Sequence, residues 1–387
     1  MNILFCNETP FFSNLGGVER VSCLLAQEFI KGGHVPVFFS LKNENNYIHS
    51  TDGIKRYYLS NDIADPNLFF IELLQKEKID IIINQTPVYD MYKLLKNCNK
   101  KNIKIVTVIH NQPFSTFGKE KIYKKLVTPS TIRAKILKQI GRFFPSVYRK
   151  GRFNFDLNRL EYLLEISDKI FLLSDRYIKR ITNLAPQLNI NKFDAINNPN
   201  TFDSEIENTE KDNIVLFIGR FYDPQKNVTG FIDVWEKFHK NCPDWKAIVV
   251  GDGPDKEKIC KYAKTRGVEN IQFTGNRKDV TNFYSKAKFL CMTSLYEGWP
   301  MVLSEAMHHR CIPFVYNTFE AVDDIIQNGN SGIIIEDINA SKMAEQMMLL
   351  AQDDKYREKI AINASSKIKD FSLEKIAKIW EEKLKAI

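Results

Sequence analysis

Short apolar runs alternate with longer amphipathic segments along most of the chain. The run at residues 2–6 is followed by a loop-like stretch at 10–17 and by a segment at 18–30 with apolar residues at helical spacing. Two glycines then end this predicted helix before the next apolar run, at 35–39. The order of strand, helix and strand predicts a βαβ unit in which the two strands are parallel.

The same alternation extends through the first half of the chain and restarts in the second half. The later apolar runs lie at 79–83, 103–109, 169–173, 214–218, 245–250, 271–273 and 289–292. Short apolar runs separated by helix-length segments are typical of parallel strands that helices cover on both faces. Each half is therefore predicted to be an α/β domain.

An acidic, polar stretch divides the two halves. The 387 residues exceed the roughly 100 to 200 of one typical domain, and residues 201–212 hold five acids but only two apolar side chains. The predicted domains are listed here: a first domain at 1–203, a linker at 204–212, a second domain at 213–370, and a C-terminal helix at 371–387 that can cross back to the first domain. Two facing domains predict an active site in the cleft between them.

Composition narrows the class of protein. The chain is 44% apolar and 26% charged, which is ordinary for a globular protein, and no apolar run approaches the roughly 18 residues of a membrane span. The first residues have no basic leader and Glu8 interrupts their apolar run, so we expect a cytoplasmic protein. The seven cysteines form no C-x-x-C pair and the chain has no D-x-D motif, so we expect no metal.

Candidate ligand-binding residues follow the apolar runs of the second half, because open parallel sheets bind ligands at the carboxyl ends of their strands. Gly219 and Arg220 follow the run at 214–218, and Lys226 lies across a turn from them. An arginine fork and a lysine point charge on one loop suit a pyrophosphate. A solvated surface loop is the alternative.

Two further strand ends carry glycines or polar residues. Gly251 and Gly253 form a tight turn where missing side chains let a ligand approach the backbone, and Asn276 and Arg277 follow the run at 271–273. The glycines do not complete a dinucleotide fingerprint, because Lys256 occupies the third glycine position. A dinucleotide-dependent oxidoreductase is therefore disfavoured.

The most informative segment follows the run at 289–292. Glu297 lies in a loop, a predicted helix begins beside Pro300, and Glu305 lies within that helix. The free N–H groups of a helix start form an anion site, and flanking carboxylates accept hydrogen bonds from hydroxyls. A nucleotide sugar has hydroxyls on both sides of its diphosphate, although Glu305 could instead be an exposed helix carboxylate. The candidate donor-binding residues between the glutamates are Gly298, Trp299, Pro300, Met301 and Val302.

The order and spacing of these motifs over residues 214–336 resemble those of glycosyltransferase family 4. The resemblance implies a GT-B fold of two Rossmann-like domains and a retaining transferase that works without a metal. It also implies that Arg220 and Lys226 stabilise the leaving diphosphate, that Glu297 holds the donor sugar and that Glu305 holds the ribose. Proton transfer to the leaving phosphate oxygen is the usual account of retention here, so no protein nucleophile is predicted.

In the first half the resemblance is limited to short motifs. It places Gly16 and Gly17 in an N-terminal loop close to the diphosphate and acceptor, and His110 near the reacting sugar. One residue departs from the family pattern. Where related chains commonly carry glycine after the helix of the second glutamate, this chain has Arg310, so a left-handed helix end would cost about 1 kcal/mol.

Much of the net charge of +8 is concentrated between residues 119 and 152, which hold eleven basic residues and one acid. Apolar residues at helical spacing between 132 and 144 predict a basic amphipathic helix. The candidate membrane- or acceptor-side residues are Lys124, Lys125, Arg133, Lys135, Lys138 and Arg142. Such a helix suits peripheral contact with an anionic membrane and a lipid-linked acceptor, or it packs on its own domain. No nucleic-acid-binding motif accompanies it, so nucleic acid is not expected as a partner.

These observations favour a glycosyltransferase. We expect transfer of a hexosyl or N-acetylhexosaminyl unit from a nucleoside diphosphate sugar, UDP-linked, to a saccharide or lipid-linked saccharide, as in bacterial surface polysaccharide or lipopolysaccharide synthesis. No cofactor is expected, since the nucleotide sugar is a substrate. The alternatives are a nucleotide-sugar 2-epimerase on the same scaffold, which would convert its substrate without an acceptor, and a non-catalytic lipid-binding protein.

Overall fold

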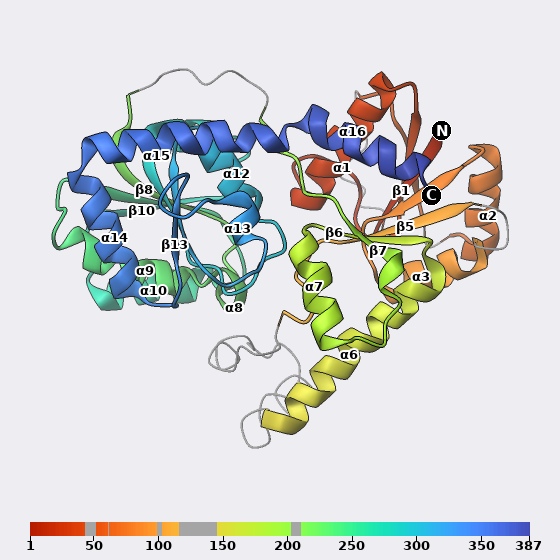
Figure 1. The fold of residues 1–387 in the computed structure, drawn as a ribbon, viewed down its shortest axis with the longest axis horizontal. Coiled ribbons are helices and arrows are strands. Elements are labelled where there is room, and N and C mark those ends of the chain that lie inside the picture. Colours follow the sequence, from red (N-terminus) through yellow and green to blue (C-terminus); the bar gives the residue numbers. More distant parts are fainter. Residues whose placement is uncertain (43–51, 61, 99–102, 116–144, 203–209) are drawn as a thin grey trace. The chain divides into compact units, whose positions relative to one another are not determined.

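The computed structural model describes residues 1–42, 52–60, 62–98, 103–115, 145–202 and 210–387 (Figure 1). It divides into two compact units. Unit 1 comprises Met1–Pro113, Asn154–Thr201 and Phe371–Ile387, and unit 2 comprises Phe114–Phe153 and Phe202–Asp370. Each unit contains one sheet whose paired strands all run parallel.

Unit 1 is built on a seven-stranded sheet in the order β3-β2-β1-β4-β5-β6-β7. Its strands are β1 (Asn2–Asn7), β2 (Val35–Ser40), β3 (Lys55–Tyr58), β4 (Ile81–Asn84), β5 (Lys104–Ile109), β6 (Lys169–Leu172) and β7 (Phe193–Ala195). Its helical elements are α1 (Gly17–Lys31), α2 (Pro66–Lys76), α3 (Tyr89–Cys98), α7 (Asp175–Leu184), η2 (Ile190–Lys192) and α16 (Leu373–Lys385). Helix α6 (Pro145–Ile166) begins in residues grouped with unit 2 and ends in unit 1.

The C-terminal helix α16 packs against α1, at the other end of the chain (Figure 1). The Trp380 ring meets the edge of the Phe171 ring on β6 with centroids 5.1 Å apart. The Lys383 ammonium also pairs with the Asp194 carboxylate on β7 at 2.5 Å. An apolar stripe and an ion pair thus bind the last residues of the chain to its first domain.

Unit 2 is built on a six-stranded sheet in the order β10-β9-β8-β11-β12-β13. Its strands are β8 (Asp212–Ile218), β9 (Lys246–Val250), β10 (Ile271–Gly275), β11 (Ala287–Met292), β12 (Ile312–Tyr316) and β13 (Ile333–Ile335). Its helices are α8 (Asp223–Lys226), α9 (Val228–His239), α10 (Lys256–Arg266), α11 (Thr281–Lys286), α12 (Met301–His308), α13 (Val322–Ile325), α14 (Ala340–Gln352) and α15 (Asp354–Lys367). The short helix η3 (Ile368–Phe371) crosses the division between the units.

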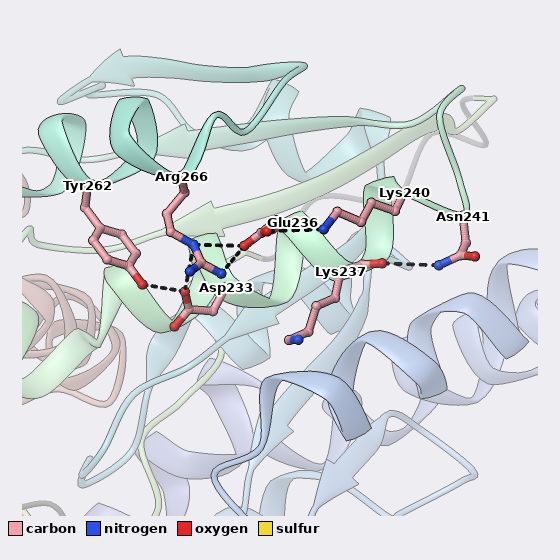
Figure 2. Close-up of polar contacts among 7 residues, drawn as sticks. All are labelled: Asp233, Glu236, Lys237, Lys240, Asn241, Tyr262 and Arg266. Carbon is pink, nitrogen blue, oxygen red and sulfur yellow. Dashed lines mark hydrogen bonds and ion pairs between the residues drawn. The ribbon is translucent and has the colours of Figure 1, made fainter.

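Aromatic packing and a polar network hold α9 in unit 2. On the sheet side, the Trp245 and Phe289 rings stack with centroids 4.7 Å apart, and Phe238 of α9 meets both rings edge-on. On the α10 side, the Tyr262 hydroxyl donates to Asp233 at 2.6 Å (Figure 2). Nearby, Arg266 pairs with Glu236, and Lys240 approaches the same carboxylate within 3.3 Å (Figure 2).

The α/β fold predicted from the sequence is confirmed. Each predicted apolar run is a strand whose bounds match within about two residues, and the helix predicted at 18–30 is α1. In both sheets the connections diverge beside one central strand. This switch point lies between β1 and β4 in unit 1 and between β8 and β11 in unit 2.

The helix end at Arg310 adopts the left-handed conformation that favours glycine. Arg310 has φ 54°, its N–H donates to the Met307 carbonyl at 3.1 Å, and the Cys311 N–H donates to the Ala306 carbonyl at 2.9 Å. These two bonds satisfy carbonyls at the end of α12. The helix therefore ends with the hydrogen bonds that a glycine would allow. The Arg310 side chain makes this left-handed conformation less favourable than it would be for glycine.

The glycines after β9 allow two loops to approach at backbone distance. Gly251 has φ 149°, and a Cβ there would overlap the Gly219 carbonyl oxygen. Gly253 has φ 158°, and a Cβ there would lie 2.7 Å from the Phe221 carbonyl oxygen. Because the Phe221 N–H also donates to the Asp252 carbonyl at 2.8 Å, these glycines serve contact between the loops after β8 and β9.

We predict that Gly251→Ala lowers the free energy of unfolding by roughly 3 kcal/mol or more, because the methyl group must displace backbone. Gly267→Ala is the matched control, since Gly267 has φ 62° but no atom within 4 Å of its Cβ position. It should cost only about 1 kcal/mol. Urea unfolding of both variants measures the difference, and equal losses would contradict the close-approach argument.

Candidate active site

The candidate site of unit 2 lies at the switch point between β8 and β11. Lys226 is the last residue of α8, in the loop that follows β8, and Glu297 lies in the loop after β11. The Lys226 ammonium is 2.6 Å from the Glu297 carboxylate, and the glutamate is 6% exposed. The structure thus pairs the predicted cation directly with the predicted donor-sugar carboxylate.

Hydrogen bonds to backbone carbonyls join the same two loops. The Leu295 N–H donates to the Gln225 carbonyl at 2.7 Å, and the Asn227 side-chain amide donates to the Thr293 carbonyl at 3.1 Å. In return, the Thr293 hydroxyl donates to the Asn227 carbonyl at 2.9 Å. Asn227 is left-handed, with φ 50°, which turns the chain sharply from α8 into α9. These hydrogen bonds therefore hold together the two loops that carry the ion pair.

Helix α12 begins beside this pair and carries the second glutamate. Its N-cap residue Pro300 provides no side-chain cap, and the Pro300 carbonyl accepts from the Leu303 N–H at 3.1 Å. Glu305 is 5% exposed, and its carboxylate accepts a hydrogen bond from the Tyr284 hydroxyl at 2.8 Å. Glu305 is thus a buried, positioned carboxylate, and the alternative of an exposed helix residue is wrong.

The remaining candidates of unit 2 lie along the same edge of the sheet, which gathers the ends of parallel strands. Arg220 is exposed after β8, and Asn276 and Arg277 are exposed after β10. The residues from Glu297 to the start of α12 are more enclosed. Gly298, Trp299 and Pro300 are buried, and Met301 and Val302 are half-buried.

Unit 1 presents a second polar strand-end group. Gly16 and Gly17 are exposed at the start of α1. His110 follows β5, and its Nε2 lies 2.6 Å from the Gln85 side-chain oxygen at the end of β4. Burial lowers the pKa of His110 to about 4, so its ring is neutral at pH 7.

Polar residues that sequence reasoning missed surround Glu19 at the unit 1 switch point. The Glu19 carboxylate accepts hydrogen bonds from Asn7 at 3.1 Å and from Thr9 at 2.6 Å, and the Thr86 hydroxyl donates to the Asn7 side chain. Asn7 and Gln85 close their apolar runs, so the strand-end rule used for the second half would have found them. The six basic candidates at 124, 125, 133, 135, 138 and 142 lie outside the described residues.

Known structures share this two-unit architecture. HepE of Anabaena, solved with UDP and glucose, matches with a TM-score of 0.75 over 100% of both chains, at 14% identity. TarM of Staphylococcus aureus matches with a TM-score of 0.76 over 98% of both chains, at 15% identity. The protein therefore has the two-domain GT-B fold of a class of glycosyltransferases.

Sequence comparison identifies the family within that class. A model described as Glycosyltransferase Family 4 matches residues 15–157, and one described as Glycosyl transferases group 1 matches residues 200–367. The chain belongs to family 4 of the glycosyltransferases, group 1, as the spacing of its motifs predicted. Within the part of the chain that the structure describes, no helix is both long and apolar enough to cross a bilayer.

Two relatives indicate the range of this family. An α-1,4-N-acetyl-D-galactosaminyltransferase of Campylobacter jejuni, whose named substrate is a saccharide on diphospho-undecaprenol, is 25% identical over 95% of this chain and 94% of its own length. The amylovoran biosynthesis glycosyltransferase AmsD of Erwinia amylovora is 29% identical over 63% of this chain and 67% of its own length. Both are glycosyltransferases.

We predict that Lys226→Met destabilises the ligand-free protein by about 2 to 3 kcal/mol, because it removes the cation that pairs with the buried Glu297 carboxylate. Lys256→Met is the control. Its lysine pairs with Asp252 at 2.7 Å, but both side chains are nearly half exposed, so the loss should stay within about 0.5 kcal/mol. Urea unfolding at neutral pH compares the two, and a loss at Lys226 as small as that at Lys256 would contradict the buried-pair argument.

Proposed function

We propose that the protein transfers a hexosyl or N-acetylhexosaminyl unit from a UDP-sugar to a lipid-linked saccharide, with retention of anomeric configuration and without a metal. The observation that carries this proposal is the ion pair between the partly exposed Lys226 and the buried Glu297 at the switch point, beside the start of α12. A switch point provides a ligand crevice, and this one has a cation, an anion and a helix start.

The donor proposal is supported by how the site matches the parts of a nucleotide sugar. Lys226 and the exposed Arg220 supply positive charge for the diphosphate, and the N–H groups at the start of α12 supply further donors. The buried carboxylates of Glu297 and Glu305 are acceptors for sugar and ribose hydroxyls. HepE, which shares the fold, was solved with UDP. We propose UDP as the nucleotide of the present chain by analogy with HepE.

The acceptor proposal is supported by relatives that align over nearly the whole chain. Besides the transferase described above, a second Campylobacter jejuni enzyme, which acts on N-acetylgalactosaminyl-diacetylbacillosaminyl-diphospho-undecaprenol, is 22% identical over 94% of this chain. An acceptor on a polyprenyl diphosphate is held at a membrane surface. Transfer would then take place at the inner face of the cell membrane, with the protein in peripheral contact.

The chemistry requires charge stabilisation rather than a protein nucleophile. The bond between the anomeric carbon and the phosphate oxygen breaks while the acceptor oxygen bonds to the same face of that carbon. The leaving phosphate oxygen takes the acceptor proton, and Lys226 and Arg220 stabilise the remaining negative charge. Glu297 keeps the Lys226 ammonium in place and accepts from the sugar.

We predict that Lys226→Ala and Glu297→Gln each lower kcat at least about 100-fold, because each removes charge stabilisation or its orientation. Transfer from UDP-N-acetylhexosamines to an undecaprenyl-diphosphate-linked saccharide is measured by chromatography, with EDTA present. The anomer of the product is read by NMR, and the α-linked donor should give an α-linked product. Lys240→Ala, which removes an exposed lysine paired with Glu236, should keep full activity.

Several results would contradict this proposal. Full activity of both site variants would disprove the assignment of Lys226 and Glu297. Loss of activity in EDTA that added Mg²⁺ restores would contradict a metal-independent reaction, and a β-linked product would contradict retention. Conversion of the donor to a second nucleotide sugar in the absence of acceptor would identify an epimerase instead.

A further inference from the structure

Tyr284 is a buried tyrosine whose hydroxyl is directed at the second glutamate of the site. It lies on α11, is 0% exposed, and donates to Glu305 Oε2 at 2.8 Å. The two residues come from different helices, α11 before strand β11 and α12 after it. No motif in the sequence marks Tyr284.

The ring of Tyr284 is held from several directions within unit 2. It stacks on His309 with centroids 5.7 Å apart and planes 18° apart, and Phe202 meets the His309 ring edge-on at 4.7 Å. The Lys211 ammonium donates to the carbonyls of Tyr284 at 2.9 Å and of His309 at 2.5 Å. Tyr284 therefore has little freedom to move relative to α12.

His309 also connects this cluster to Glu305. Its Nδ1 lies 2.9 Å from the Glu305 carbonyl, and because a carbonyl only accepts, Nδ1 carries the proton of this hydrogen bond. Burial lowers the pKa of His309 to about 4, so the ring is neutral at pH 7. The backbone and the carboxylate of Glu305 thus receive hydrogen bonds from two rings that stack on each other.

The side chain of a glutamate does not by itself present its carboxylate in one orientation. The terminal torsion of Glu is broad and roughly two-fold, so rotation of the carboxylate costs little. A ribose offers two neighbouring hydroxyls in a fixed geometry, and their recognition requires a fixed carboxylate. A hydrogen bond from a buried tyrosine to one carboxylate oxygen provides that restraint, and bonds to charged groups are among the stronger ones.

We propose that Tyr284 is a positioning residue for the nucleotide. Its hydroxyl fixes the Glu305 carboxylate in the orientation that accepts the ribose hydroxyls of the donor. This inference rests on the proposed function, because it takes the ligand of Glu305 to be the ribose of a nucleoside diphosphate. Tyr284 itself does not contact the reacting atoms.

The test compares two probes that differ only in the ribose hydroxyls. Calorimetry measures the binding of UDP and of 2′,3′-dideoxy-UDP to the unaltered protein and to Tyr284→Phe, which keeps the ring and removes the hydroxyl. We expect the substitution to weaken UDP binding about tenfold, as for loss of a hydrogen bond to a charged group, and to change dideoxy-UDP binding less than twofold.

Tyr262→Phe is the matched control (Figure 2). It removes another tyrosine hydroxyl of unit 2 that donates to a carboxylate, that of Asp233 on α9, at 2.6 Å. Neither nucleotide should bind this variant differently from the unaltered protein. Thermal unfolding of both variants without ligand establishes that each is folded at the temperature of the titrations.

The outcomes separate this inference from the proposed function. If the unaltered protein prefers UDP to dideoxy-UDP but Tyr284→Phe binds both as before, or loses both equally, Tyr284 has no positioning role and the donor proposal stands. If the unaltered protein binds the two nucleotides equally well, Glu305 does not recognise the ribose hydroxyls and the inference is overturned. If it binds neither UDP nor UDP-sugars, the donor proposal itself fails and this inference fails with it.

Discussion

The ion pair of Lys226 and Glu297 is the interaction on which the donor site depends. It joins the loops after β8 and β11, at the switch point where parallel sheets bind ligands. Each charge alone would be costly to bury, and each offsets that cost for the other. Hydrogen bonds through Thr293 and Asn227 fix the two loops, so the charges are oriented before a ligand arrives.

Two residues with positive φ, Gly251 and Arg310, shape the backbone of unit 2 in different ways. Gly251 has no side chain because the neighbouring loop fills the space, so its role is packing between strand ends. Arg310 takes a left-handed conformation that favours glycine, and the two hydrogen bonds that end α12 form nonetheless. The last carbonyls of the helix that carries Glu305 therefore keep their hydrogen bonds.

Sequence periodicity predicted most strands and the residues that follow them, including Lys226 and Glu297, because parallel strands bury continuous apolar runs. It missed the short strands β3, β7 and β13. It also missed β12, where Pro313 interrupts an apolar run at a position typical of edges rather than sheet interiors. Sequence periodicity also did not predict the hydrogen bond from Tyr284 to Glu305. That contact depends on how α11 and α12 pack, and the pattern of apolar residues within each helix does not indicate how the two helices pack.

A structure of the protein crystallised with an intact UDP-sugar tests the donor assignment most directly. The account predicts the diphosphate within hydrogen-bonding distance of Lys226 and of the first N–H groups of α12, the ribose hydroxyls on Glu305, and the sugar beside Glu297. A nucleotide bound away from the β8–β11 switch point, or bound there with its ribose turned from Glu305, would contradict it.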